Sequence, residues 1–288
     1  MQQRDFTIRE LTLKANEIRQ SIISMLLEAG SGHTAGPLGM ADVFTTLYFD
    51  LLRHDPANPT WSERDRLVLS NGHICPVLYA AMAHSGYFPV EELLTLRKYG
   101  SRLQGHPHRD FLPYLENSSG PLGSGLSQAV GMAIADRMDN GIATSRTIYC
   151  LLGDGELNEG NNWEAIMLGG KEKLHNLIAI VDRNNIQIDG YTEDVMPLDS
   201  LNKKWESFNW HVQEIDGNNI QAIIDAVHQA KAVFEKPSVI IARTIPGKGV
   251  KEFERKFEWH GKAPNKEEAS IALNELRTLG GKIKSEHK

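Results

Sequence analysis

Two apolar runs joined by a helix-length segment constrain the fold of this chain more than any other feature. Residues 147–152 and 177–181 are rich in β-branched and aliphatic side chains, and about 25 residues of helix-compatible sequence separate them. Runs of this length are typical of buried parallel strands, and the segment between them is long enough for a crossover helix. The pair therefore predicts an α/β protein built on a parallel sheet.

Polar residues follow each of these runs directly. Gly153-Asp154-Gly155 comes after the first run and Asn184-Asn185 after the second, with 30 residues from Asp154 to Asn184. The carboxyl ends of parallel strands are where open α/β sheets bind ligands. Glycines allow a bulky anion to approach the backbone, and the positive end of the following helix favours negative charge there. One carboxylate, one amide and one backbone carbonyl form half a shell for Mg²⁺, which takes its other oxygens from phosphates and water. The motif predicts a metal–diphosphate site.

Further strands are expected at residues 66–70, 211–216 and 238–245, each separated from the next by helical periodicity. At least five strands that alternate with helices predict a doubly wound, mostly parallel sheet with helices on both faces. We interpret residues 31–39 as a loop and residues 76–99 as two helices. The composition does not shift along the chain, so we expect residues 1–288 to form a single domain.

Charge and composition exclude several classes of protein. The net charge is −6 and the pI near 6.0, which gives no electrostatic footprint for nucleic acid. No stretch of eighteen apolar residues and no signal-like N-terminus occurs, so we expect a soluble cytoplasmic protein without membrane contact. The only two cysteines, Cys75 and Cys150, lie in apolar contexts and are expected to be reduced core residues.

Histidines and glycines recur in the loops expected at the same rim. The segments are Gly32-His33, Ser70-Asn-Gly-His73, Gly105-His106-Pro107, Gly120-Pro-Leu-Gly123 and Trp259-His260-Gly261. Imidazole transfers protons near neutral pH, although a single histidine is more often structural than catalytic. The neighbouring glycines favour a functional role for His33, His73 and His106.

Charged residues near the motif have a simpler interpretation as well. Glu159 and Glu164 could be solvated charges in the first turns of a helix, where negative charge is favourable. For Glu156 we prefer that interpretation, although its position in the motif also makes it a candidate for cofactor binding. Lys248, between two glycines at the rim, is interpreted as a surface lysine rather than a diphosphate ligand.

Taken together, these segments resemble the N-terminal, thiamine diphosphate-binding domain of transketolase. The resemblance extends from Ser31 to Gly261, and the pairing of Gly-Asp-Gly with a later Asn-Asn is similar to the thiamine diphosphate motif. The sequence departs from the family pattern at Thr34-Ala35 and at residues 101–104. These departures bear on the identity of the substrate more than on the identity of the cofactor.

The resemblance implies a role for each matched residue. Thiamine diphosphate and Mg²⁺, with Ca²⁺ or Mn²⁺ as possible substitutes, are the implied cofactors, and the side chains of Asp154 and Asn184 with the Ile186 carbonyl would hold the metal. The implied cofactor-binding residues are His73, Gly120, Leu122, Gly153, Asp154, Gly155, Glu156, Asn184 and His260. The implied catalytic residues are His33, His73, His106 and His260, with Glu159 and Glu164 in a carboxylate chain between two active sites.

The resemblance also implies a partner. The pyrimidine-activating glutamate of these enzymes lies in a separate domain, and this chain stops after one α/β unit. We therefore expect a transketolase of carbohydrate and pentose phosphate metabolism that acts with a C-terminal subunit carrying the pyrimidine-binding domain, as an α₂β₂ heterotetramer. A sugar or sugar phosphate is the expected substrate.

Two other functions remain open. The chain could be the matching subunit of another thiamine diphosphate enzyme, similar to deoxyxylulose-phosphate synthase or a 2-oxo acid dehydrogenase. It could also be a non-catalytic nucleotide-binding or regulatory module, which would leave the order of the rim segments unexplained.

Overall fold

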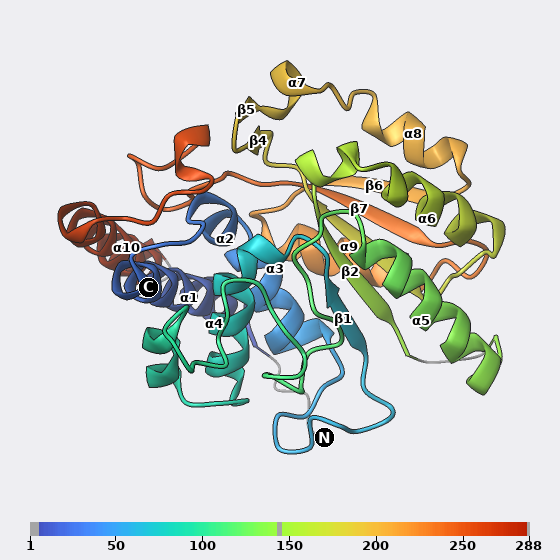
Figure 1. Cartoon of the computed structure of the whole chain (residues 1–288), viewed down its shortest axis with the longest axis horizontal. Coiled ribbons are helices and arrows are strands. Elements are labelled where there is room, and N and C mark those ends of the chain that lie inside the picture. The colour runs from blue at the N-terminus through green and yellow to red at the C-terminus, as the bar shows by residue number, and fades with distance from the viewer. Residues whose placement is uncertain (1–5, 143–145, 287–288) are drawn as a thin grey trace.

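A five-stranded parallel sheet forms the centre of the computed structural model, which describes residues 6–142 and 146–286. The strand order is β1-β2-β3-β7-β6 (Figure 1). The strands are β1 (Arg66–Leu69), β2 (Ile148–Gly153), β3 (Leu177–Asp182), β7 (Ser238–Arg243) and β6 (His211–Asp216). All four neighbouring pairs are parallel. The doubly wound α/β class expected from the sequence is confirmed.

Helices cover both faces of this sheet. The longer helices are α1 (Ile8–Ala29), α3 (Ala41–Thr46), α4 (Cys75–Ser85), α5 (Gly125–Asn140), α6 (Gly160–Lys171), α8 (Leu201–Ser207), α9 (Ile220–Lys231) and α10 (Lys266–Glu286). On one face α9 packs on β6 and β7, and α1, α3 and α4 contribute side chains to the same core. Helices α5, α6 and α8 lie over the other face. Successive strand residues alternate between the two cores, as in Tyr149 and Cys150, because side chains in a strand point to opposite faces in turn.

Local sequence signals set the helix boundaries. Thr7 and Glu10 form a capping box at the start of α1, and Gly30 ends the helix with a φ of 64°. Asn219 caps α9 through its side-chain oxygen, which accepts a hydrogen bond from the Ala222 amide. Cys75 and Cys150 are buried free thiols, as expected.

Shorter elements complete the described chain. They are α2 (Ala35–Gly39), α7 (Thr192–Val195), the strand pair β4 (Ile186–Gln187) and β5 (Gly190–Tyr191), a π-turn (Leu47–Leu51) and 3₁₀ turns at Gly72–Ile74, Val90–Thr95, Gly155–Asn158 and Phe257–Trp259. Two expectations were wrong in detail. Residues 31–39 contain the helix α2, and the second helix expected within residues 76–99 is only the 3₁₀ turn that follows Pro89.

The carboxyl ends of β1, β2 and β3 point to one rim of the sheet. The strand pair β4–β5 and helix α7 lie together beyond that rim, at the top of the view (Figure 1). None of the helices within residues 6–142 and 146–286 is long and apolar enough to cross a membrane.

Candidate active site

A cavity of about 430 Å³ opens where β1, β2 and β3 end. It collects most of the residues that the sequence singled out, although they come from seven separate segments. These residues are His33, His73, His106, Gly120, Leu122, Gly153, Asp154, Gly155, Glu156, Asn184, Ile186 and His260. The same cavity is also lined by Asn71, Asp182, Gln187, Ile188 and Asp189. The rim loops therefore meet at one site.

Asp154 is the carboxylate of the expected metal site. It is 1% exposed. Its Oδ1 accepts a hydrogen bond from the Gly155 amide at 2.7 Å. Its Oδ2 accepts two, from the Asn185 amide at 2.6 Å and from Arg183 Nη1 at 3.0 Å. Burial raises the pKa of Asp154, and Arg183 and the two amides oppose that rise. A carboxylate accepts about four hydrogen bonds, so one acceptor position is left for a cation.

Hydrogen bonds hold both ends of the Asn184 amide, and its oxygen keeps one acceptor position for a further ligand. Its Nδ2 donates to Asp182 Oδ2 at 2.7 Å, and its Oδ1 accepts from the Ile186 amide at 3.0 Å. Asp182 is buried, and burial raises its pKa to about 7 despite hydrogen bonds from Thr244 and Asn184. Asp182 orients Asn184 because it accepts a hydrogen bond from the NH₂ end of the amide, the end opposite to the oxygen.

The donor set fits a magnesium ion that is completed by a ligand. Asp154, Asn184 and Ile186 line one cavity and offer only oxygen donors, which Mg²⁺ prefers. In the described part of the chain, no group of three or more His, Cys, Asp or Glu side chains could hold a metal by itself. This half shell suits a cation that takes its remaining ligands from a diphosphate and water.

Three histidines that line the same cavity form a cluster. The ring centroids of His33 and His73 are 4.9 Å apart, those of His73 and His260 5.1 Å, and those of His33 and His260 5.4 Å. Burial, and then the proximity of the other imidazoles, lowers the pKa of His33 to about 3 and that of His73 well below its usual value. Burial alone lowers the pKa of His260 to about 4. The cluster is therefore neutral at neutral pH.

His106 is an exposed residue at the edge of the same cavity, and its charge contributes to the lowered pKa values of His33 and His73. Burial and the neighbouring Arg97 lower its pKa. A histidine at this edge can reach a substrate without being enclosed by the cofactor site.

Unpaired polar atoms show that the cavity is built for a polar ligand. Asn71 is fully buried, and neither its Oδ1 nor its Nδ2 has a hydrogen-bond partner within the described residues. The same holds for His33 Nδ1, His260 Nδ1 and Gln187 Nε2. Buried polar groups are almost always hydrogen-bonded in folded proteins, so these atoms indicate a bound molecule with donors and acceptors of its own.

The glycine-rich loop before α5 lies against the tip of β1 and the start of α6. A Cβ at Gly125 would come within 2.4 Å of Ser70, and a Cβ at Gly123, whose φ is 83°, within 2.7 Å of Glu159. These two glycines are needed for contacts inside the protein. Gly120, with a φ of 155°, lines the cavity itself.

The preferred interpretation of Glu156 as a solvated helix charge was wrong. The residue is 3% exposed, and its carboxylate accepts hydrogen bonds from Ser70 Oγ at 2.5 Å, the Gly123 amide at 2.8 Å and the Gly153 amide at 3.0 Å. It turns inward because three donors from separate segments converge on it. Glu156 therefore joins β1, the glycine-rich loop and β2 behind the cavity.

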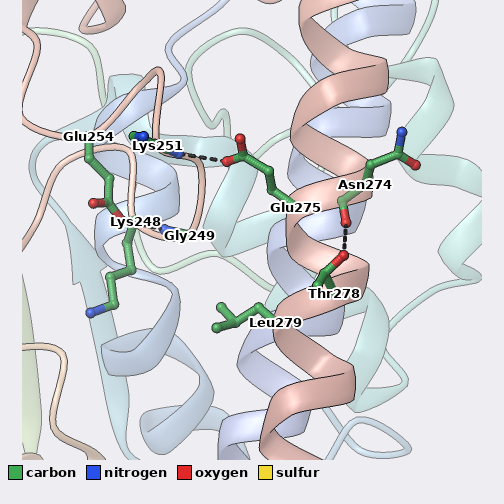
Figure 2. Close-up of a pocket in the computed structure, with 8 residues that line it drawn as sticks. All are labelled: Lys248, Gly249, Lys251, Glu254, Asn274, Glu275, Thr278 and Leu279. Carbon is green, nitrogen blue, oxygen red and sulfur yellow. Dashed lines mark hydrogen bonds between the residues drawn. The ribbon is translucent and has the colours of Figure 1, made fainter.

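The other charged candidates lie outside the cavity. Glu159 and Glu164 are exposed at the beginning of α6. Figure 2 shows Lys248 in a separate pocket between residues 248–254 and α10, with its side chain pointing away from Glu275. This agrees with a surface lysine, since Lys248 is not among the residues around Asp154.

Four residues of the site and its surroundings were not predicted from the sequence: Asn71, Asp182, Arg183 and Gln187. Asn71 stands inside the Ser70-Asn-Gly-His73 segment, so its place in the motif was a usable signal. The ion pair between Arg183 and Asp154 had no such signal, because it depends on how two strand ends face each other.

Acid is expected to destabilise the fold through the histidine cluster. His33 and His260 have pKa values of about 3 and 4 when folded, against about 6.5 in an unfolded chain. Below about pH 6.5 the unfolded chain therefore binds more protons than the folded chain. The free energy of unfolding falls as the pH drops from about 6.5 to the folded-state pKa values of about 4 and 3. At pH 5 each histidine accounts for up to about 2 kcal/mol of this loss.

Urea unfolding of His33→Gln at pH 7 and pH 5 tests this expectation. The variant should lose less stability between the two pH values than the unchanged chain does. His228→Gln, at an exposed position on α9, should behave like the unchanged chain. Equal acid losses in all three proteins would contradict the depressed pKa of His33.

The comparisons with known proteins agree with this geometry. Residues 11–280 match the family model described as "Transketolase, thiamine diphosphate binding domain". The chain is 45% identical over 271 residues to "6-deoxy-6-sulfo-D-fructose transketolase subunit SqwG" of Clostridium sp. (strain MSTE9), covering 94% of this chain and 98% of that protein. It is 41% identical over 271 residues to an apulose-4-phosphate transketolase subunit of Actinobacillus succinogenes, covering 93% and 96%.

A solved structure extends the likeness to three dimensions. Transketolase from Campylobacter jejuni superposes with a TM-score of 0.84 at 34% identity, covering 97% of this chain and 48% of that one. The chain thus spans about half the length of that solved transketolase. It belongs to the transketolase family, as its thiamine diphosphate-binding part, and is a subunit of a transketolase-type transferase.

Proposed function

We propose that this chain binds magnesium thiamine diphosphate in the cavity at the ends of β1, β2 and β3 and transfers a two-carbon ketol unit from a ketose to an aldose. The observation that carries the proposal is the position of Asp154, Asn184 and Ile186 in one cavity with four histidines. Asp154, Asn184 and the Ile186 carbonyl would hold the magnesium. The Gly155 backbone, His73 and His260 would contact the diphosphate, and Gly120 and Leu122 the rings.

The residues of the chain have distinct tasks in this proposal. Thiamine diphosphate, when bound, supplies the nucleophilic carbon and the electron sink for carbon–carbon bond cleavage. The neutral imidazoles of His33, His73 and His260 would accept and return protons of substrate hydroxyls. His106, at the edge of the cavity, would face the donor sugar.

We propose that residues 1–288 form one diphosphate-binding domain and that a second polypeptide supplies the pyrimidine-binding and C-terminal domains, in an α₂β₂ assembly. Exposed apolar side chains around the cavity support a partner. Leu122 is 42% exposed and Ile188 66%, and both line the cavity. Exposed apolar surface beside a site is typical of an interface. Glu159 and Glu164, exposed at the start of α6, would meet that interface.

The substrate proposal is a sugar or a sugar phosphate. One relative is named for a sulfonated sugar and another for a sugar phosphate, so an anionic group at the far end of the substrate is expected. The guanidinium of Arg97 lowers the pKa of both His33 and His106, which places a positive charge near the cavity. We further propose a cytoplasmic location, which the two free thiols favour because cytoplasmic cysteines stay reduced.

The test is an assay for ketol transfer by the purified chain, with and without a C-terminal transketolase subunit that carries the pyrimidine-binding domain. Activity is expected only when both chains, thiamine diphosphate and Mg²⁺ are present. Turnover by this chain alone would refute the need for a partner. Release of CO₂ from a 2-oxo acid donor, instead of ketol transfer between sugars, would favour the other thiamine diphosphate enzymes considered above.

His106→Ala is expected to lower turnover much more than it weakens cofactor binding. The residue lies at the edge of the cavity, and loss of a proton-transferring group costs roughly 10²-fold or more in rate. Steady-state kinetics and a thiamine diphosphate titration on the two-chain complex measure the two effects. His108→Ala, two residues further along and outside the cavity, is the matched control. Equal losses of rate and cofactor affinity would contradict the placement of His106 beside the substrate.

A further inference from the structure

Arg183 occupies an unusual place beside the proposed metal site. It is the first residue after β3, and its side chain is 2% exposed. One guanidinium nitrogen, Nη1, contacts Asp154 Oδ2 at 3.0 Å, and the other, Nη2, contacts Glu193 Oε1 at 2.5 Å and Asp199 Oδ1 at 3.4 Å. One buried cation therefore connects the tip of β2 with the segment that follows β5.

That segment is folded around the same ion pairs. Glu193 Oε1 also accepts a hydrogen bond from the Leu198 amide at 3.1 Å, and the Glu193 amide donates to Asn185 Oδ1 at 3.2 Å. Asn185 in turn donates its amide to Asp154 at 2.6 Å. The contacts form a closed ring from Asp154 through Arg183, Glu193 and Asn185 back to Asp154.

Arg183 does not contact the space where the cofactor would lie. It lines a neighbouring cavity on the far side of Asn184, together with Arg243 and Arg255, and is not among the residues that line the cavity with the histidines. Its effect on a bound metal would therefore pass through Asp154. Residues that orient a metal ligand commonly change metal affinity by about 10- to 100-fold when they are replaced.

We infer that Arg183 is a positioning residue, which holds the Asp154 carboxylate and the segment from Glu193 to Asp199 in the binding geometry before the metal arrives. The metal part of this inference rests on the proposed function. A guanidinium suits the task because its planar group of donors can satisfy several carboxylates at once and stays charged when buried. Without it, Asp154 would be a buried carboxylate without its cation, which is strongly unfavourable.

Hydrogen exchange on the cofactor-free chain tests the positioning itself. Arg183→Gln should speed exchange at least tenfold in residues 185–199, where the Asn185 and Leu198 amides donate to carboxylates that Arg183 holds, while β2 and β3 stay protected. Arg183→Lys should restore part of the protection. Arg243→Gln is the matched control, because Arg243 ends the next strand and pairs with Glu214 at a half-exposed position. Protection of residues 185–199 that is unchanged in Arg183→Gln would overturn the inference.

Mn²⁺ titration of the two-chain complex with thiamine diphosphate measures the effect on the metal. Arg183→Gln should weaken Mn²⁺ binding by about 10- to 100-fold, and Arg243→Gln should not. Equal or tighter Mn²⁺ binding by Arg183→Gln would overturn the inference, since it would show that the arginine competes with the metal. If Arg183→Gln does not fold, Glu193→Gln removes one anchor of the ring and should speed exchange in the same segment to a smaller extent.

The two proposals fail in different ways. A wild-type complex that binds neither thiamine diphosphate nor Mn²⁺ would refute the proposed function. The exchange measurement needs no cofactor, so it still decides whether Arg183 holds the segment and Asp154 together.

Discussion

Asp154→Ala is expected to abolish retention of thiamine diphosphate by the two-chain complex. Asp154 is the one charged side chain in the proposed half shell, because Asn184 and the Ile186 carbonyl are neutral donors. The substitution also removes one of the carboxylates that pair with the buried Arg183, so the cofactor-free chain should lose stability as well. Breaking a buried pair from one side typically costs 3–5 kcal/mol.

Asp154→Asn tests whether the charge of the carboxylate, rather than the volume of the side chain, is needed to hold the cofactor. Its amide keeps the shape and an oxygen donor but lacks the negative charge, so cofactor affinity should fall by more than 100-fold while the side chain still fills the site. Asp189→Asn is the matched control, because Asp189 lines the same cavity but is exposed. Calorimetric titration with thiamine diphosphate and Mg²⁺ gives the affinities. Unchanged affinity in Asp154→Ala would refute the metal assignment.

Glu156→Ala is expected to destabilise the chain by at least about 3 kcal/mol, since three buried donors lose their acceptor and each unsatisfied donor costs roughly 1–3 kcal/mol. The donors are Ser70 Oγ and the amides of Gly123 and Gly153. They belong to three segments that line or support the cavity, so cofactor affinity should fall with stability.

Urea unfolding measures the loss. Glu159→Ala, three residues further on and exposed, should change the free energy of unfolding by less than about 0.5 kcal/mol. Glu156→Gln should keep part of the stability because its amide oxygen can still accept hydrogen bonds. A stability of Glu156→Ala within 1 kcal/mol of the unchanged chain, taken as roughly one hydrogen bond, would contradict the structural role assigned to this carboxylate.

The strands and the ligand-binding rim could be predicted from local pattern. β2 and β3 are continuous apolar runs, and buried parallel strands have this composition. Because all five strands are parallel, the position of Asp154 and Asn184 at a common edge followed from the chain direction alone. This part of the site depended on no long-range information.

The inward direction of Glu156 could not be predicted from local pattern. Its partners Ser70 and Gly123 lie 86 and 33 residues away in sequence. A glutamate just before a helix is usually solvated, and only the packing of three segments reverses that preference. The ring around Arg183 was missed for the same reason.

The histidine cluster could be predicted only in part. His33, His73 and His260 come from distant loops, and no periodicity relates them. The resemblance to transketolase implied that they meet, and the structure places their rings within 5.4 Å of one another. Their depressed pKa values arise from burial together, which only the assembled fold could reveal.

A crystal structure of the two-chain complex with thiamine diphosphate, grown with Mn²⁺ in place of Mg²⁺, tests the central claim most directly. The anomalous signal of the metal should appear as one peak in contact with the Asp154 carboxylate, the Asn184 amide oxygen and the Ile186 carbonyl, with the diphosphate on its open side. A metal peak in contact with neither Asp154 nor Asn184, or a cofactor bound outside the cavity that the four histidines line, would contradict the account.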